Sequence, residues 1–143
     1  MPDWIDYNGH MTEFRYGQVF SDATDAVIKA GGFDEAYLAK GLSFYTVETH
    51  IRFLGEMSLA DEFTTKSQIL LFDGKKLHLC HEMINEAGEV VATGEHMLLH
   101  VDTKKGASAP AMTPVNKALA QIADGHLHLP RPDYSGRSIG LKK

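Results

Sequence analysis

The amino-acid sequence predicts an α+β fold in which one long helix packs on one face of an antiparallel sheet. Residues 12–30 carry apolar side chains at the three-and-four spacing of an amphipathic helix. Residues 44–101 then alternate between segments rich in β-branched and aromatic residues and short turns. One of these turns is the pair Asp73-Gly74, which is typical of a β-hairpin. A single long helix followed by a meander of strands is the element order of an α+β domain.

The helix is expected to run from Thr12 to Ala30. Its predicted buried stripe consists of Tyr16, Val19, Phe20, Ala23, Val27 and Ala30. Its predicted solvent-facing side consists of Arg15, Gln18, Asp22, Asp25 and Lys29. The glycines at positions 31 and 32 favour a left-handed backbone that ends the helix.

Four strands are expected after the helix, at residues 44–54, 63–72, 75–84 and 89–101. The alternation in the first strand predicts one face formed by Tyr45, Val47, Thr49, Ile51 and Phe53.

The remaining segments are shorter. Residues 3–8 are compatible with a brief strand, residues 33–41 with a short helical turn, and residues 115–123 with a short helix. We expect one domain over residues 1–124 and an irregular tail, rich in Pro, Gly and His, over residues 125–143.

Charge and composition exclude several classes of protein. The net charge is −5, and the Lys and Arg residues do not form the basic stripe that binds a nucleic-acid backbone. The apolar runs are too short to span a membrane, and residues 1–20 lack the pattern of a signal peptide. A single cysteine, Cys80, fits a reducing compartment. We therefore expect a cytoplasmic protein with no nucleic-acid partner and no membrane partner.

A carboxylate before the helix is the first candidate for chemistry. Asp6 precedes the turn Asn8-Gly9, which leads into the helix. The unpaired amides of the first helical turn, around Thr12 and Glu13, could accept a developing oxyanion, helped by the helix dipole. Asp6 could attack a carbonyl held there or activate water to do so, which suits a thioester because a thiolate leaves easily. The alternative is that Asp6 and Asn8 only cap the helix.

The motif Asp6-x-x-Gly9-His10-Met11, with Tyr16 six residues after His10, resembles the opening of hotdog-fold thioesterases of the 4-hydroxybenzoyl-CoA thioesterase type. The resemblance continues, in the element order of that family, at residues 47–54 (VETHIRFL), 60–63 (ADEF), 91–95 (VATGE) and 101–102 (VD). It implies a hotdog fold, with the long helix packed on a curved antiparallel sheet.

The same resemblance implies an active site. Asp6 would be the catalytic base or nucleophile, and the amides at Thr12 and Glu13 would polarise the thioester carbonyl. It also implies a homodimer or a tetramer of dimers, with the acyl-CoA substrate near the subunit interface and no cofactor beyond the CoA of that substrate. Many relatives have two asparagines where this chain has Thr12 and Glu13, a change that keeps the backbone amides but alters side-chain contacts.

Within this family, the stretch from Trp4 to Glu13 most resembles the betainyl-CoA thioesterases of carnitine degradation. Aromatic rings near the site could hold a trimethylammonium group, and a carboxylate could add negative potential. The predicted substrate-binding residues are Trp4, Tyr7, Asn8, Gly9, His10, Phe14, Tyr45 and Glu48. The alternatives are an aromatic or medium-chain acyl group in a neutral pocket, aromatic residues that serve only packing, and a hotdog domain that binds acyl-CoA without turnover.

The sequence does not predict a metal site. On the expected strands, His78 and His81 point to opposite faces. His96 and His100 share a face but lie ~13 Å apart along one strand, too far for one zinc ion. Cys80 lies in the middle of a strand, where a small buried side chain is its usual role.

Overall fold

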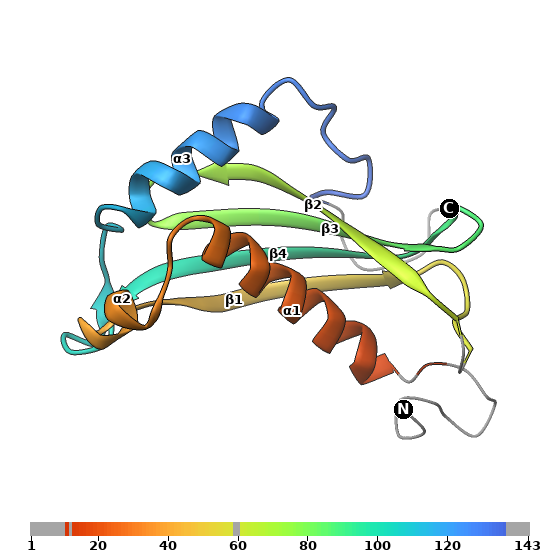
Figure 1. Ribbon diagram of the computed structural model, residues 1–143, viewed down its shortest axis with the longest axis horizontal. Helices are drawn as coiled ribbons and strands as arrows, with labels where there is room; N and C mark the ends of the chain where they lie inside the picture. Colours follow the sequence, from red (N-terminus) through yellow and green to blue (C-terminus); the bar gives the residue numbers. More distant parts are fainter. Residues whose placement is uncertain (1–10, 12, 59–60, 137–143) are drawn as a thin grey trace.

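A long helix crosses one face of a curved antiparallel sheet in the computed structural model, which describes residue 11, residues 13–58 and residues 61–136 (Figure 1). The helices are α1 (Glu13–Ala30), α2 (Glu35–Ala39) and α3 (Val115–His126). The strands are β1 (Leu42–Phe53), β2 (Phe63–Phe72), β3 (Lys76–Asn85), β4 (Val90–Asp102) and β5 (Ala107–Ser108). This arrangement confirms the predicted α+β fold. None of the helices in these ranges is long and apolar enough to cross a membrane.

The strands follow the order β1-β4-β3-β2, and β5 pairs with the end of β4. All of these pairs are antiparallel. The four long strands begin and end within two residues of their predicted limits, and α2 forms in the predicted helical turn. Helix α3 continues to His126, so the first two residues of the tail predicted to be irregular are helical. The brief strand predicted at residues 3–8 lies outside the described residues.

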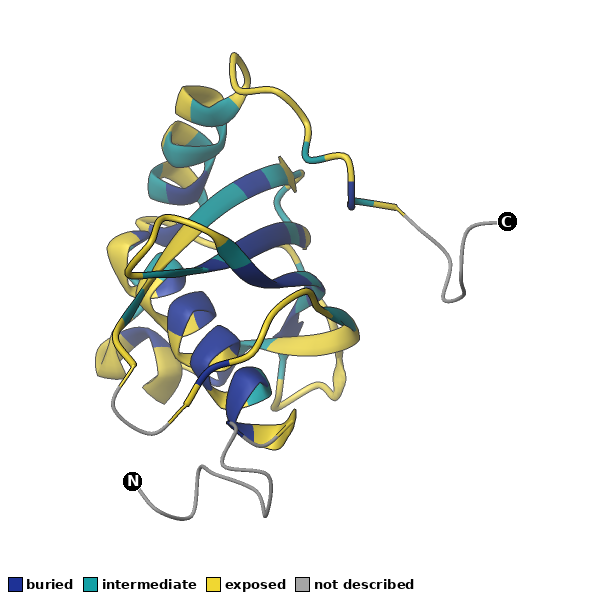
Figure 2. Ribbon diagram, turned by 90° about the vertical axis from the view of Figure 1, so that its right-hand side faces the viewer, coloured by how far each residue is buried: buried dark blue, intermediate teal, exposed yellow. Residues whose placement is uncertain are grey.

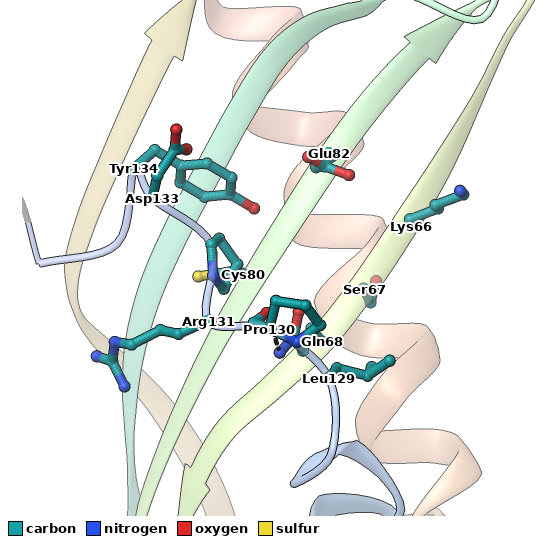
Figure 3. Close-up of a pocket in the computed structure, with 11 residues that line it drawn as sticks. Lys66, Ser67, Gln68, Cys80, Glu82, Leu129, Pro130, Arg131, Asp133 and Tyr134 are labelled. Carbon is teal, nitrogen blue, oxygen red and sulfur yellow. Dashed lines mark hydrogen bonds between the residues drawn. The ribbon is translucent and has the colours of Figure 1, made fainter.

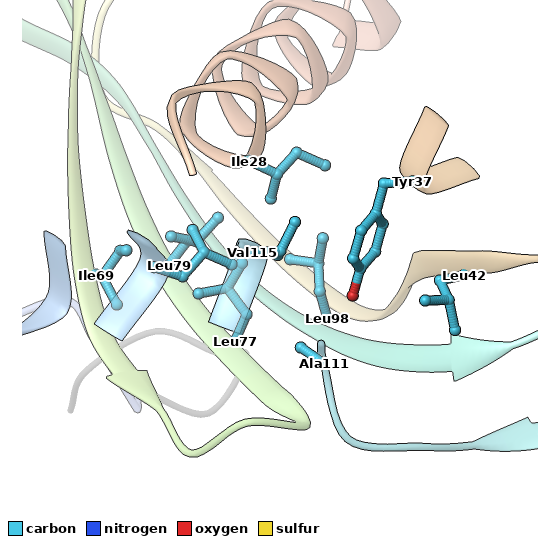
Figure 4. Close-up of a cluster of buried hydrophobic side chains, with 10 residues drawn as sticks. Ile28, Tyr37, Leu42, Ile69, Leu77, Leu79, Leu98, Ala111 and Val115 are labelled. Atoms are coloured by element: carbon cyan, nitrogen blue, oxygen red, sulfur yellow. The ribbon is translucent and has the colours of Figure 1, made fainter. Parts of the chain in front are cut away.

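Two clusters of buried apolar side chains fill the space between the helices and the sheet. The first gathers around the C-terminal end of α1 (Figure 4) and consists of Ile28, Tyr37, Leu42, Ile69, Leu77, Leu79, Leu98, Ala111, Val115 and Leu119. The second gathers around its N-terminal half and consists of Met11, Tyr16, Val19, Phe20, Met57, Met83, Val91 and Ala92. Figure 2 shows the same distribution, with buried segments concentrated on α1 and the central strands.

The buried face of α1 departs from the predicted stripe at both ends. Ala30 is exposed, and Ile28 is buried in its place because the last turns of α1 pack against Val115 and Leu119 of α3. Arg15, predicted to face solvent, is only 7% exposed. The periodicity of α1 alone reveals neither the burial of Arg15 in the first turn nor the cover that α3 provides at the other end, so the prediction was wrong at Ala30 and Arg15.

The end of α1 is a Schellman motif. Gly32 has a φ of 89°. The Gly32 amide donates to the Lys29 carbonyl at 2.9 Å, and the Phe33 amide donates to the Ile28 carbonyl at 3.1 Å. The predicted left-handed stop is therefore confirmed.

Strand β1 contains a bulge that its alternating sequence does not reveal. Its register with β4 shifts between Thr46 and Glu48, which makes Val47 an extra residue. An extra residue reverses which side chains face the helix on either side of it.

The bulge separates residues that were predicted to share a face. Thr49, Ile51 and Phe53 lie opposite the β4 residues that face α1, whereas Tyr45 and Glu48 lie opposite β4 residues of the other face. The prediction of a common face from Tyr45 to Phe53 was therefore wrong.

Residues 127–136 lie against the sheet face opposite α1 (Figure 3). Tyr134 is 7% exposed, and its hydroxyl donates to the carbonyl of His81 at 3.5 Å. The Gly136 amide donates to the carboxylate of Glu95 at 2.9 Å. These contacts tie the segment after α3 to β3 and β4. The boundary predicted at residue 124 stays a prediction.

We expect Gly31→Ala to lower the free energy of unfolding by about 1–3 kcal/mol, because overpacking a filled core is destabilising. A Cβ atom at Gly31 would lie 2.5 Å from Cδ2 of Leu119, which is fully buried. The matched control is Gly125→Ala in α3, where a Cβ atom would meet nothing within 4 Å. The control is expected to stabilise the fold by about 0.4–1 kcal/mol. Urea unfolding measures both, and equal effects of the two substitutions would contradict this packing.

Candidate active site

Most of the predicted catalytic turn lies outside the described residues. This applies to Trp4, Asp6, Tyr7, Asn8, Gly9, His10 and Thr12. The predicted site residues that the structure describes are Glu13, Phe14, Tyr45 and Glu48.

The start of α1 is anchored to the loop after β1. The amide of Met11 donates to the carbonyl of Met57 at 2.6 Å. Both side chains are buried, and Met57 is fully so. Helix α1 begins two residues later, at Glu13, so the position of its first turn is fixed relative to the sheet. The first amides of a helix have no partner within the helix and are available to an anionic group.

A groove runs between the first turns of α1 and the end of β1. Its lining residues are Glu13, Phe14 and Gly17 of α1 and Thr49, Ile51 and Phe53 of β1, and its volume is about 570 Å³. Gly17 keeps the groove open because it places no side chain there; a Cβ atom at this position would lie 3.9 Å from Cδ1 of Ile51.

The groove continues along α1 as a second, narrower section of about 280 Å³. The two sections share Gly17, Thr49 and Ile51. The inner section adds Thr24 and Asp25 of α1, among others.

Glu13 and Phe14 were predicted site residues, and both line the groove. Its other lining residues, Gly17, Thr49, Ile51 and Phe53, were not among the predicted site residues. A glycine in the middle of an amphipathic helix was an available signal for close packing or an open space. Alternation along the whole strand did not predict the orientation of Phe53 relative to Tyr45, because the bulge at Val47 puts the two side chains on opposite faces of the sheet.

Tyr45 and Glu48 do not join this groove within one chain. Both are exposed, and both lie on the sheet face away from α1. The sheet therefore separates them from Glu13 and Phe14. Their predicted contact with substrate stays a prediction.

Two histidines are buried under α1 in the middle of the sheet. His81 is fully buried, and its two ring nitrogens hydrogen-bond with the hydroxyls of Thr24 at 2.8 Å and Ser67 at 2.7 Å. Nδ1 of His96 hydrogen-bonds with the hydroxyl of Thr49, on the groove wall, at 3.1 Å. The centroids of the two histidine rings are 5.3 Å apart.

Burial keeps both rings neutral near pH 7. Loss of hydration lowers the pKa of His81 to about 3, with a smaller contribution from His96. The same cause lowers the pKa of His96 to about 4. Nε2 of His96 is buried with no hydrogen-bond partner in the described part of the chain. A Cβ atom at Gly94 would lie 2.8 Å from that nitrogen, so the ring occupies space that the glycine leaves free.

A second pocket, of about 330 Å³, lies on the opposite face of the sheet beneath residues 129–134 (Figure 3). Its charged lining residues are Lys66, Glu82, Arg131 and Asp133, which are of mixed sign. Cys80 also lines it, and burial raises the pKa of this thiol to about 12. The thiolate needed for nucleophilic attack is therefore disfavoured, which agrees with the structural role predicted for Cys80.

His78 and His81 follow the strand geometry predicted for them. His78 points away from α1 and pairs with the Glu95 carboxylate at 2.6 Å, whereas His81 points toward α1. This confirms their predicted opposite orientation. Within residues 11, 13–58 and 61–136, no three His, Cys, Asp or Glu side chains are placed to hold a metal ion.

Comparison with known proteins connects this geometry to a family. The sequence profile of the thioesterase-like superfamily matches residues 1–121. The chain is 50% identical over 141 residues to the L-carnitine dehydrogenase/betainyl-CoA thioesterase of Rhizobium meliloti, covering 98% of this chain and 28% of that protein. It is 38% identical over 143 residues to the betainyl-CoA thioesterase of Pseudomonas aeruginosa, covering 99% of this chain and 90% of that protein.

The fold is similar to a solved structure as well. A hypothetical protein of Staphylococcus aureus, determined in complex with CoA, has a TM-score of 0.91 and 26% identity, covering 98% of this chain and 89% of that chain. This likeness confirms the predicted hotdog fold, a long helix on a curved antiparallel sheet.

We expect the free energy of unfolding to fall as the pH is lowered from about 6.5 to 5. The folded-state pKa values of His81 and His96 lie below the ordinary value, so the unfolded chain binds protons in this range that the folded chain does not. Each histidine contributes a loss of up to about 1.4 kcal/mol per pH unit. Chemical unfolding at several pH values measures the slope, and His96→Gln is expected to make it shallower. A stability independent of pH across this range would contradict the burial of neutral rings.

Proposed function

The chain belongs to the thioesterase-like superfamily, and from this premise we propose that it hydrolyses an acyl-CoA thioester, with betainyl-CoA as the substrate and glycine betaine and CoA as the products. The chain spans less than a third of the length of the bifunctional relatives that it matches. It matches 90% of a relative whose name is betainyl-CoA thioesterase alone. This comparison supports the assignment of thioesterase chemistry, rather than dehydrogenase chemistry, to this chain.

One structural observation carries the proposal: the anchored start of α1 opens onto the groove between α1 and β1. A thioester carbonyl at this helix start would meet the amides at Thr12 and Glu13, which would stabilise the oxyanion. Asp6 precedes the helix by a few residues in the sequence. The proposed substrate contacts of Trp4, Tyr7, Asn8, Gly9 and His10 belong to the same segment.

The proposed reaction uses the Asp6 carboxylate in one of two ways. As a base it takes a proton from water, the resulting hydroxide adds to the carbonyl carbon, and the carbon–sulfur bond breaks to release the CoA thiolate. As a nucleophile it adds to the carbonyl carbon itself, expels the thiolate and leaves a mixed anhydride, which water then hydrolyses. Both routes consume one water molecule and yield the free acid and CoA. Neither requires a cofactor beyond the CoA of the substrate.

We expect Asp6→Asn to lower kcat/KM for betainyl-CoA by a factor of about 10²–10⁴, the usual contribution of a positioned base or nucleophile. Release of free CoA, detected with a thiol reagent, measures the rate. The control is Asp22→Asn, which removes the same charge from the exposed side of α1 and is expected to leave the rate unchanged. If Asp6→Asn hydrolyses betainyl-CoA as fast as the wild-type protein does, the mechanism is refuted.

Two other functions fit part of the observations. The apolar lining residues Phe14, Ile51 and Phe53 would also suit an aromatic or medium-chain acyl group. A hotdog domain that binds acyl-CoA without hydrolysis would show tight binding and no release of CoA. A panel of CoA esters, assayed for both binding and turnover, separates these functions from the first.

We further propose a homodimer, or a tetramer of dimers, in the cytoplasm. Strand β1 is an edge of the sheet and exposes Tyr45 and Val47. An edge strand with exposed apolar side chains is a surface on which a second chain can pair. A single, buried cysteine suits the reducing conditions of the cytoplasm.

Val47→Lys is expected to shift the protein toward monomers, because a charge on the edge strand opposes pairing. The matched control is Leu71→Lys on β2, the opposite edge, where the side chain is similarly exposed. Sedimentation velocity measures the association state. A monomeric wild-type protein would contradict the proposed assembly, and an equal shift in both variants would contradict the role of β1.

A further inference from the structure

We infer that the outer section of the groove between α1 and β1 holds the cationic head of the acyl group, a quaternary ammonium, against Glu13, Phe14 and Phe53. The inference rests on the proposed function and names the residues that distinguish a cationic acyl group from a neutral one. Phe53 was not among the predicted site residues, and Glu13 was predicted only for its backbone amide.

The short acyl group limits how far the cation can lie from the reacting carbonyl. A single methylene separates the ammonium nitrogen of a betainyl group from the thioester carbonyl. If the carbonyl lies at the amides that open α1, the cation must lie beside the first turn of that helix. Glu13 and Phe14 belong to this turn, and both line the groove. Asp25 also lines the groove but is ~18 Å farther along α1 at 1.5 Å per residue, which is too far.

The charge of the groove also favours a cation. Among the described lining residues of its two sections, the carboxylates are those of Glu13 and Asp25, and there is neither Lys nor Arg. His96, the one histidine among these described lining residues, is kept neutral by burial, which lowers its pKa to about 4. The groove is therefore negative near pH 7 and attracts a cation.

Two aromatic rings, those of Phe14 and Phe53, line the outer section of the groove. Phe14 is 63% exposed and Phe53 is 47% exposed, so both rings are accessible from the groove. The ring of Phe53 is held by the buried Tyr16, with centroids 5.0 Å apart and an interplanar angle of 85°. Aromatic ring faces are the usual surface with which proteins hold quaternary ammonium groups.

The alternative location is the opposite sheet face, where Tyr45 and Glu48 also combine a ring with a carboxylate. Within one chain the sheet lies between this pair and the first turn of α1. The reach of a betainyl group therefore favours the groove, and variants at the two locations distinguish them.

The test compares two CoA esters of the same shape and different charge. In 3,3-dimethylbutyryl-CoA a neutral carbon replaces the ammonium nitrogen of betainyl-CoA. The measured quantity is the ratio of kcat/KM for betainyl-CoA to that for the neutral ester. We expect Glu13→Gln to lower this ratio by about fivefold or more. We expect Phe53→Leu, which keeps an apolar side chain but removes the ring, to lower it by about 2- to 30-fold.

Two further variants serve as comparisons. Asp22→Asn removes the same charge from the side of α1 opposite Glu13 and is expected to keep the ratio. Tyr45→Leu tests the other sheet face and is expected to keep it as well. An unchanged ratio in both Glu13→Gln and Phe53→Leu would overturn the inference and leave thioester hydrolysis standing. A ratio that falls only in Tyr45→Leu would overturn it in favour of the opposite face.

A binding measurement separates this inference from the proposed function. Titration calorimetry on Asp6→Asn gives the Kd of each ester without depending on turnover. If the wild-type protein hydrolyses neither ester, but Asp6→Asn prefers the cationic one and loses that preference when Glu13→Gln is added, the hydrolase proposal fails and the cation site stands. Equal Kd values for the two esters in Asp6→Asn would overturn the cation site whatever the rate of turnover.

Discussion

The close approach of Phe20 to the backbone of β4 sets the position of α1 on the sheet. A Cβ atom at Gly94 would lie 3.0 Å from the Phe20 ring, so the ring can rest there only because position 94 has no side chain. Phe20 also stacks on His81, with centroids 6.0 Å apart and an interplanar angle of 9°. Helix α1 therefore lies close to the middle of the sheet. Because Gly17 faces β1 without a side chain, a groove is left on that side.

The polar groups beneath the helix follow from the same constraint. Bringing α1 close to β3 and β4 encloses His81 and His96, and hydroxyls from Thr24, Thr49 and Ser67 satisfy three of their four ring nitrogens. Buried imidazole is tolerated in its neutral form when it is hydrogen-bonded, whereas a charged ring there would be strongly disfavoured. The packing that positions the helix thus keeps His96, on the wall of the groove, uncharged near pH 7. The burial of the two neutral histidines also makes the free energy of unfolding fall in mild acid.

Local patterns in the sequence were sufficient for the fold. The amphipathic period of α1, its glycine stop and the turn at Asp73-Gly74 predicted the helix, its end and the strand limits. The errors arose where packing between distant segments overrides a local period. Ala30 was misplaced because α3 decides which side of the last turns of α1 is covered, and Arg15 is buried although its place in the helical period predicts exposure. The spacing of apolar residues along one helix does not reveal such contacts.

The candidate site was less predictable from sequence for a specific reason. The bulge at Val47 inserts one residue into a strand whose side chains alternate regularly, and no glycine or proline marks it. It places Tyr45 on the outer face, beside Glu48, and separates it from Phe53, with which it was predicted to share a face. The resemblance to a family supplied Asp6, which spacing alone could not distinguish from a helix cap.

A crystal structure of Asp6→Asn with betainyl-CoA tests the account most directly, because it locates both the reacting carbonyl and the cation. The account predicts the thioester carbonyl at the amides that open α1 and the trimethylammonium group between Glu13 and Phe53. A ligand whose carbonyl lies away from that helix start, or whose ammonium group lies beside Tyr45 and Glu48 on the other face of the same sheet, would contradict it.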